Sequence, residues 1–288
     1  MRELTGRTAV VTGAASGMGL AFAERFASEG MNVVLADIED SALQRAVDGI
    51  RASGAQALGV RADVSSADSM RALAMATTEA FGNVHVLCNN AGVEGYLEGA
   101  IWEAAQVDWE WTMGVDFWGV VHGVREFVPG MVAHGEQAHG VNTASMMGLV
   151  TASNMYAIAK HAVVALSETL YTDLRLRESN VGVSVLCPGM VATQLFYGSR
   201  NRPQNLSIER DESAARRAAD IRDQYDAQLQ QSTAPAFVAG LVVDAIRDDQ
   251  FYILSDRDWD NDIEARFEHV RARSNPVIGS TAYEVPDI

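Results

Sequence analysis

A tyrosine and a lysine stand four residues apart in the segment YAIAK, as Tyr156 and Lys160. The run that follows, up to Leu170, is mostly small and apolar, as in a packed helix. Positions i and i+4 of a helix share one face, so the phenol and the ammonium would meet the same neighbour. An ammonium favours the phenolate and so lowers a tyrosine pKa from its usual value of about 10, which suits acid–base catalysis. A core tyrosine beside a surface lysine is the alternative interpretation.

A glycine-rich segment, TGAASGMG, spans residues 12–19 directly after the strand-like TAVVT and before a helical pattern. Glycines here would let the backbone approach a pyrophosphate, which then rests on the N-terminus of the helix. Asp37 closes the next strand-like run, where a carboxylate can bind both ribose hydroxyls and would repel a 2′-phosphate. No arginine or lysine stands at positions 14–16 or 38 to offset that repulsion, so NAD is favoured over NADP. The residues expected to bind the dinucleotide here are Gly13, Ser16, Gly17, Met18, Gly19, Asp37 and Ile38.

Short β-branched runs alternate with longer helical patterns along the chain. The expected strands are 8–12, 32–37, 57–64, 84–92, 140–145, 181–189 and 251–256. The expected helices include 19–30, 41–54, one ending at Phe81, 235–249 and 262–273. Near-continuous apolar strands separated by helices indicate an α/β fold with a doubly wound parallel sheet and helices on both faces.

Two regions depart from the simple alternation. Residues 194–234 are long, polar and rich in arginine and acid, which is typical of a lid or binding loop with some helix of its own. We expect a single doubly wound domain over residues 1–256 that includes this lid. Residues 257–288 would then form a C-terminal helical tail.

The composition limits the possible partners and the compartment. The 288 residues carry a net charge of −16, so phosphate backbones and anionic lipid would repel the chain. Neither nucleic acid nor a membrane is expected as a partner, and no stretch approaches the roughly 20 apolar residues that span a bilayer. Two isolated cysteines, Cys88 and Cys187, and the absence of a signal-peptide pattern favour a cytoplasmic location. The scattered histidines show no metal-ligand spacing.

With TGAASGMG, NNAG, YAIAK and PGMVAT in this order, the chain resembles the short-chain dehydrogenase/reductase family from about Leu4 to Asp256. The resemblance implies a Rossmann-type sheet of about seven strands, a homodimer or homotetramer, and NAD-dependent interconversion of alcohols and ketones. Tyr156 and Lys160 match the family's catalytic pair, and Ser145 matches its serine. Lys160 would also bind the nicotinamide ribose. The resemblance further assigns cofactor contacts to Asp63, Val64, Asn90, Ala91, Gly92, Pro188, Gly189, Val191 and Thr193.

Two positions differ from the family pattern. Where an asparagine is usual before the serine strand, this chain has Asp116, and an ionised carboxylate accepts hydrogen bonds but does not donate them. Asp116 is a candidate catalytic-site residue that could hold Lys160, or else an ordinary helix residue. Ten residues separate Ser145 from Tyr156, two fewer than is common, so the pocket wall between them is expected to differ.

The substrate pocket is expected from the segments after NNAG, after the serine and after PG. These residues are mostly apolar, which favours a bulky hydrophobic or aromatic secondary alcohol or ketone. The candidates are Val93, Glu94, Met146, Met147, Met155, Met190, Phe196 and Tyr197. The tryptophans at 102, 109, 111 and 118 are assigned to packing or subunit contact instead.

The sequence therefore favours an NAD-dependent oxidoreductase in which Tyr156 is the general acid/base. A catalytically silent NAD-binding sensor or scaffold on the same fold is the main alternative, to which Asp116 and the short loop point. A lyase or dehalogenase on this fold would not need the dinucleotide, and the complete glycine loop with Asp37 disfavours it.

Overall fold

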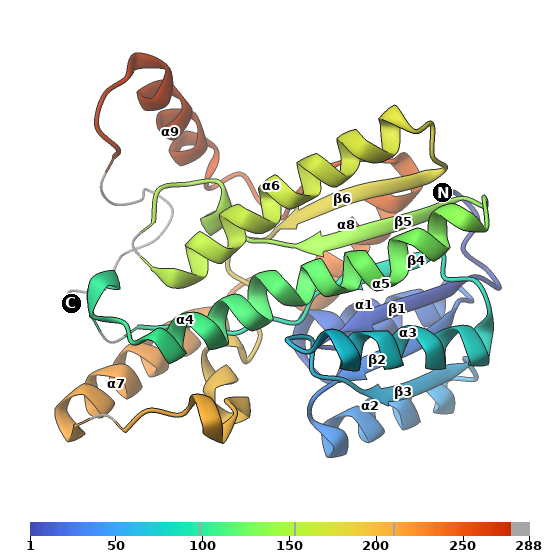
Figure 1. Ribbon diagram of the computed structural model, residues 1–288, viewed down its shortest axis with the longest axis horizontal. Helices are drawn as coiled ribbons and strands as arrows, with labels where there is room; N and C mark the ends of the chain where they lie inside the picture. Colours follow the sequence, from blue (N-terminus) through green and yellow to red (C-terminus); the bar gives the residue numbers. More distant parts are fainter. Residues whose placement is uncertain (98, 153, 210, 278–288) are drawn as a thin grey trace.

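The computed structural model describes residues 1–97, 99–152, 154–209 and 211–277 (Figure 1). Its centre is a parallel seven-stranded sheet in the order β3-β2-β1-β4-β5-β6-β7. The strands are β1 (Thr8–Thr12), β2 (Asn32–Asp37), β3 (Ala57–Arg61), β4 (Val86–Asn89), β5 (Ala138–Thr143), β6 (Val181–Cys187) and β7 (Tyr252–Leu254). The predicted doubly wound α/β fold is confirmed.

Helices connect the strands and cover both faces of the sheet (Figure 1). The α-helices are α1 (Gly17–Ser28), α2 (Asp40–Ala52), α3 (Ala67–Phe81), α4 (Gln106–Met113), α5 (Gly119–Ala133), α6 (Met155–Leu176), α7 (Glu212–Leu229), α8 (Pro235–Asp248) and α9 (Asp260–Ala272). Short helical turns are η1 (Ile101–Glu103), η2 (Gly114–Trp118), η3 (Met146–Gly148), η4 (Leu195–Asn201) and η5 (Gln204–Leu206). Helix α9 projects from one end of the molecule and contacts the rest through Ile263 and Arg266 (Figure 1).

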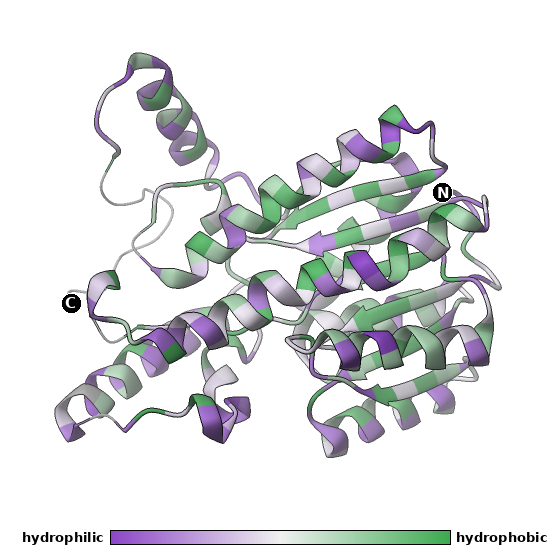
Figure 2. Ribbon diagram, viewed as in Figure 1, coloured by the Kyte–Doolittle hydropathy of each residue, from purple (hydrophilic) through white to green (hydrophobic). Residues whose placement is uncertain are grey.

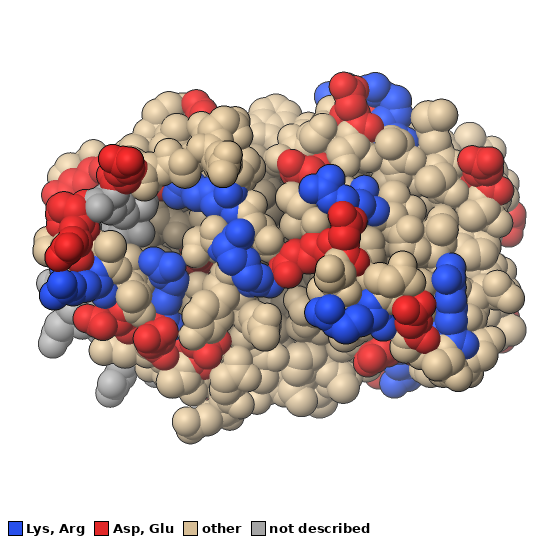
Figure 3. All heavy atoms as spheres, turned by 90° about the horizontal axis from the view of Figure 1, so that it is seen from below, with Lys and Arg blue, Asp and Glu red and all other residues tan. Residues whose placement is uncertain are grey.

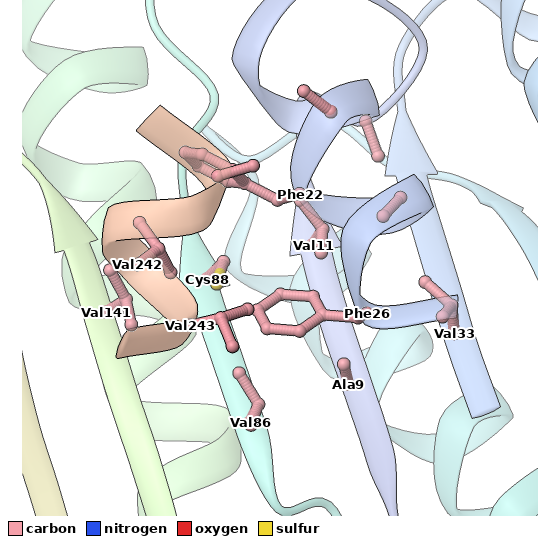
Figure 4. Close-up of a cluster of buried hydrophobic side chains, with 14 of the residues drawn as sticks. Ala9, Val11, Phe22, Phe26, Val33, Val86, Cys88, Val141, Val242 and Val243 are labelled. Atoms are coloured by element: carbon pink, nitrogen blue, oxygen red, sulfur yellow. The ribbon is translucent and has the colours of Figure 1, made fainter. Parts of the chain in front are cut away.

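Alternate residues of each strand enter different core layers. Ala9 and Val11 of β1 pack in the layer that holds α1 and α8, whereas Val10 packs in the layer that holds α3 and α5. Figure 4 shows the first layer, with Phe26 of α1 between the strands and Val243 of α8. Figure 2 shows the apolar strands between helices whose outer faces are more polar. Because both faces are covered, most strand residues are buried, which explains the near-continuous hydrophobic runs of β1, β2 and β6. Strand β5 also buries the polar residues His139, Asn142 and Thr143.

The chain leaves β1 and β4 in opposite directions, since β1 continues to β2 on one side and β4 to β5 on the other. Such a reversal leaves a crevice at the carboxyl ends of the strands, where open α/β sheets bind ligands. The lid elements η4, η5 and α7 lie beyond this end of the sheet (Figure 1). The fold therefore places the glycine loop, the end of β2 and the lid around one crevice.

Several predicted strands differ from the observed ones at their ends. Strand β3 ends at Arg61 rather than at residue 64, because the last pair with β2 is Asp37 with Arg61. Strand β5 begins at Ala138, two residues before the predicted start, since Ala138 and His139 pair with Val181 and Gly182 of β6. Pairing with a neighbouring strand fixes these limits, and a single strand's sequence does not contain that information.

The division into a catalytic domain over 1–256 and a tail over 257–288 stays a prediction. The expected tail helix is present as α9, and residues 278–288 lie outside the described part of the chain. Among the described residues, no helix is long and apolar enough to cross a membrane. On the face seen in Figure 3, acidic and basic side chains are interspersed and form no large patch of one sign.

Candidate active site

One cleft lies at the carboxyl ends of β1, β2, β4 and β5, bordered on its far side by the lid. Most of the predicted cofactor residues line it, although they come from segments far apart in the sequence. The predicted site residues that line the cleft are Gly13, Ser16, Gly17, Met18, Asp37, Ile38, Asp63, Val64, Asn90, Ala91, Gly92, Val93, Tyr156, Lys160 and Thr193. The structure thus brings the predicted dinucleotide loop and the predicted catalytic pair into the same cavity.

Gly13 and Gly19 have no room for a side chain, and a Cβ on Gly17 would lie 3.2 Å from the Thr193 side chain. Gly13 and Gly17 have φ angles of 64° and 54°, in the left-handed region that favours glycine. A Cβ on Gly13 would lie 2.8 Å from the Cα of Ala91, and one on Gly19 would lie 2.1 Å from the carbonyl oxygen of Gly13. The loop is therefore packed against NNAG on one side and opens α1 on the other, with its backbone exposed to the cleft.

Hydrogen bonds fasten the NNAG segment to the end of β1. The Thr12 hydroxyl accepts the backbone N–H groups of Asn90 (2.9 Å) and Ala91 (3.1 Å). The Asn90 amide donates to the Thr12 carbonyl at 3.0 Å. These contacts hold the floor of the cleft rigidly relative to the glycine loop.

Asp37 sits at the end of β2 beside this loop. Its two carboxylate oxygens accept the backbone N–H groups of Ala15 (2.9 Å) and Glu39 (3.0 Å). Each carboxylate oxygen has a second lone pair, so the group can still accept hydrogen bonds from ribose hydroxyls in the cleft.

Tyr156 and Lys160 lie in the first turns of α6, whose start is fixed by the Asn154 side chain accepting the N–H of Ala157 at 2.7 Å. The Lys160 side chain is only 2% exposed, yet its ammonium reaches the cleft wall. Its Nζ donates to the Thr143 carbonyl at 3.1 Å and lies 5.2 Å from the centroid of the Tyr156 ring. The predicted shared helix face is therefore present, with the cation beside the phenol.

Ser145 lies within hydrogen-bonding reach of the Tyr156 hydroxyl despite the shortened loop. Its own Oγ also accepts the N–H of Met147 at 3.2 Å and so begins the turn η3. Burial raises the pKa of Tyr156 above its usual value, the charge of Asp116 raises it further, and the hydrogen bond with Ser145 opposes both effects. In the protein alone, the phenol is therefore held in its protonated form.

Asp116 belongs to the π-helical turn η2 and is fully buried. Its Oδ1 accepts the N–H of Val93 at 2.9 Å and lies 3.6 Å from Lys160 Nζ, whereas its Oδ2 is buried without a hydrogen-bond partner. Burial raises the pKa of Asp116 to about 6, against the attraction of Lys160 and the Val93 hydrogen bond. The carboxylate thus links Lys160 to the cleft floor.

Glu94 is buried under the lid, with 4% of its surface exposed. Its Oε1 accepts the N–H of Ser199 at 3.2 Å, and its buried Oε2 has no hydrogen-bond partner. Burial raises the pKa of Glu94 to about 7, with Asp116 adding to the rise, and Arg222 of α7 and the N–H of Ser199 opposing it. The Glu94 side chain is therefore buried against the lid and is not solvated.

Several other predicted residues lie behind the cleft wall rather than on it. Met146 and Met155 have no exposed surface and are part of the core, so the structure does not support them as substrate contacts. Phe196 stacks on Tyr225 of α7 with ring centroids 4.8 Å apart, and the exposed Tyr197 donates toward Asp223. The structure also places Gly19, Glu94, Ser145, Met147, Pro188, Gly189, Met190 and Val191 outside the cleft lining.

The structure also adds residues that the sequence patterns did not single out. Trp111, assigned above to packing or subunit contact, is buried and also contributes to the cleft lining together with Val115 and Leu206. The lid brings Arg200 and Asn201 to the same cavity. No local motif could have identified them, because their position depends on where the lid folds back onto the sheet.

Comparisons with known proteins agree with this geometry. Residues 7–204 match the family model described as short chain dehydrogenase. The chain is 37% identical to 1-deoxy-11-beta-hydroxypentalenate dehydrogenase of Streptomyces exfoliatus, covering 93% of this chain and 90% of that one. It is 32% identical to a CLA biosynthesis dehydrogenase/reductase of Lactiplantibacillus plantarum, covering 94% and 95%.

A solved structure has the same fold over nearly the full length of the chain. The crystal structure of a short-chain dehydrogenase/reductase from Burkholderia phymatum in complex with NAD has a TM-score of 0.92 and 44% sequence identity. The match covers 97% of this chain and 99% of that one. The family model, the relatives and the seven-stranded fold lead to one conclusion: the chain belongs to the short-chain dehydrogenase/reductase family and is an oxidoreductase.

Proposed function

We propose that this oxidoreductase is an NAD-dependent dehydrogenase that interconverts a secondary alcohol and a ketone. The observation that carries the proposal is the buried ammonium of Lys160, 5.2 Å from the Tyr156 ring at the wall of the glycine-loop cleft. A cation held beside a phenol in a cleft is the arrangement required to move a proton at a substrate oxygen.

The residues of the cleft fit a dinucleotide. Because residues 13, 17 and 19 are glycines, no side chain at these positions blocks a pyrophosphate from the N-terminus of α1, where it binds favourably. Asp37 offers a carboxylate at the end of β2 for the ribose hydroxyls. The relative that shares 44% identity and binds NAD supports the same cofactor here.

The chemistry that NAD supplies when bound is the exchange of a hydride with the carbinol carbon. Tyr156 takes the alcohol proton during oxidation and returns it during reduction. Ser145 donates a hydrogen bond to the substrate oxygen, where negative charge develops. The Lys160 ammonium, 5.2 Å from the Tyr156 ring, favours the phenolate because a nearby cation stabilises a negative charge.

We assign Asp116 a positioning role, because it touches Lys160 and the cleft floor rather than the reacting atoms. Asp116→Asn keeps an acceptor for the Val93 N–H but removes a charge that raises the Tyr156 pKa. The pH profile of oxidation should therefore move to lower pH by about one unit. Asp116→Leu removes the acceptor as well and should lower the rate at every pH. An unchanged profile in Asp116→Asn would contradict this role.

The substrate is expected to be bulky and hydrophobic. Val93, Trp111, Val115 and Leu206 contribute apolar side chains to the cleft lining. The name of one relative denotes a dehydrogenase of a hydroxylated compound, which supports an alcohol as substrate.

The test is a panel of aliphatic, aromatic and steroidal secondary alcohols, with NADH formation followed by absorbance. At least one alcohol should give turnover, and Tyr156→Phe should lower it by about 10²–10⁴-fold while NADH still binds. Tyr171→Phe is the matched control, since Tyr171 lies on the same helix but packs on Phe251 and does not line the cleft. NADH binding without turnover on any alcohol would favour the catalytically silent alternative. Failure to bind any dinucleotide would refute the proposal.

The subunit arrangement and the compartment stay predictions. The homodimer or homotetramer is supported by two exposed apolar side chains, Trp118 of η2 (49% exposed) and Ile158 of α6 (43% exposed). Analytical ultracentrifugation of the wild type and of Trp118→Ser tests it directly, since loss of association in the variant is the expected result.

A further inference from the structure

The lid carries a cation to the adenosine end of the cleft. Arg200 Nη2 lies 2.5 Å from Glu39 Oε1, and Asn201 Nδ2 donates to the same oxygen at 2.7 Å. Glu39 follows Asp37 by two residues. The cleft is lined by both of these residues and by Arg200 and Asn201. A guanidinium is thus present where the sequence around the glycine loop supplies no positive charge.

This guanidinium is paired with Glu39 in the structure. Burial opposes ionisation of Glu39, but hydrogen bonds from Asn201 and Arg200 outweigh it and hold the pKa of the carboxyl below its usual value. The carboxylate is therefore charged at neutral pH and the ion pair persists. Arginine binds phosphate groups through two parallel hydrogen bonds, so an unpaired Arg200 beside the ribose would attract a 2′-phosphate.

The pair is also one of several contacts that hold four consecutive lid residues, 199–202, which we call the strap. The N–H of Ser199 binds Glu94, Arg200 and Asn201 bind Glu39, and Arg202 Nη1 binds Asp108 at 2.7 Å. The strap therefore spans the cleft from the substrate side to the adenosine side.

We propose that Glu39 is a second dinucleotide-specificity residue: it keeps Arg200 in an ion pair, away from the 2′ position of the adenosine ribose, and it fastens the strap over that end. The proposal rests on the function proposed above, because it assumes that the cleft binds a dinucleotide. It differs from the action of Asp37, which repels a 2′-phosphate directly. Glu39 acts by withholding the cation that would attract one.

Equilibrium binding of NADH and NADPH, measured by fluorescence titration at fixed ionic strength, tests the proposal without any substrate. Glu39→Gln removes the charge but keeps an amide of similar size. It should bind NADPH about tenfold more tightly than the wild type, a change of about 1.4 kcal/mol. It should bind NADH about threefold more weakly and release it faster, because the strap is held less firmly. Opposite changes for the two ligands cannot come from general damage to the fold.

Arg200→Gln in the Glu39→Gln background should abolish the gain in NADPH affinity. Arg200→Gln alone should leave NADPH affinity close to that of the wild type, since the arginine is already paired there. Glu29→Gln is the matched control: Glu29 forms an ion pair with Arg247, also at 2.5 Å, but lies outside the cleft. It should change neither affinity.

The proposal is overturned if Glu39→Gln leaves NADPH affinity unchanged, or if the double variant keeps the gain. It also fails if Glu29→Gln shifts the NADH-to-NADPH ratio as much as Glu39→Gln does. Should Glu39→Gln not fold, Glu39→Ala also leaves Arg200 without its ionic partner. The alanine variant should then bind NADPH more tightly than the wild type, and no gain would refute the proposal. Binding of neither dinucleotide by the wild type would instead refute the function proposed above.

Discussion

The glycine loop and the lid border the same cleft, but they are built from different kinds of contact. Asp37 at the end of β2 binds backbone groups only 22 and 2 residues away. The strap binds partners 161, 162 and 94 residues away, through Arg200, Asn201 and Arg202. The loop is therefore specified by a short sequence pattern, whereas the lid is specified by charged side chains that meet only in the folded protein.

The two regions also differ in what lies around their glycines and carboxylates. Gly19 faces backbone, which cannot move aside, while a Cβ on Gly198 of the lid would meet the end of the Glu94 side chain. Asp37 is satisfied by backbone donors, whereas Glu94 keeps a buried oxygen without a hydrogen-bond partner. We conclude that the loop is rigid and that the lid can adjust.

Substitution of the loop glycine should have the largest effect. Gly19→Ala places a Cβ 2.1 Å from the Gly13 carbonyl oxygen and 2.7 Å from the Asn90 amide nitrogen. We expect the free energy of NADH binding to become less favourable by about 3 kcal/mol, which is more than a hundredfold loss of affinity. Titration with NADH measures this loss. Gly198→Ala is the matched lid variant, with its Cβ 2.5 Å from Glu94 Oε2, and should cost less than tenfold. Equal losses in the two variants would contradict the contrast between a rigid loop and an adjustable lid.

Glu94→Gln should change how stability depends on pH. Because burial raises the folded-state pKa of Glu94 to about 7, the folded protein binds this proton more tightly than the unfolded chain does. The contribution of this protonated carboxyl to the free energy of unfolding is fully present below about pH 4.5. It is lost as the pH rises through about 7. Glutamine keeps an acceptor for the Ser199 N–H but carries no charge at any pH.

The variant should therefore be more stable than the wild type at pH 8 by up to about 3 kcal/mol, with no difference near pH 4.5. Urea denaturation at several pH values measures this difference. Glu79→Gln removes an exposed charge of α3 as a control, and its effect should stay below about 0.5 kcal/mol. A difference that does not grow with pH would show that Glu94 is solvated.

Loss of the lid's buried ion pair should release the strap without unfolding the sheet. Arg202→Met keeps an apolar side chain over the Trp111 ring but removes the contact with Asp108, which is 2% exposed. We expect thermolysin to cleave residues 194–234 about tenfold faster. This corresponds to a decrease of about 1.4 kcal/mol in the free energy of lid opening. Arg216→Met breaks an exposed pair with Glu212 on α7 and should not change the rate. Faster cleavage within β1–β4 would show that the lid and the sheet open together.

A glycine of α2 should give the smallest effect, with the opposite sign. A Cβ on Gly49 would meet no atom within 4 Å, and the residue lies inside a regular helix. Gly49→Ala should stabilise the protein by about 0.5–1 kcal/mol in urea denaturation. A destabilised Gly49→Ala variant would show that open space around a glycine does not predict tolerance here.

The sequence predicted the dinucleotide half closely, since β1 and β2 have the limits that their apolar runs indicated. Tyr156 and Lys160 were also predictable, because a spacing of four residues is a local property of a helix. The predictions were poorer on the substrate side: Met146 and Met155 are core residues, and Trp111 lies at the cleft. An apolar side chain is equally suited to a core or to a pocket wall, and only packing distinguishes the two.

The sequence alone determined the order of the elements, the loop that three glycines require, and the phenol–ammonium pair, because these features depend on neighbours a few residues apart. Tertiary structure alone decided which carboxylates are buried, where the lid returns to the sheet, and that Arg200 meets Glu39. Burial and pairing of charges depend on the solvent that folding removes and on partners distant in the chain. No local pattern carries that information.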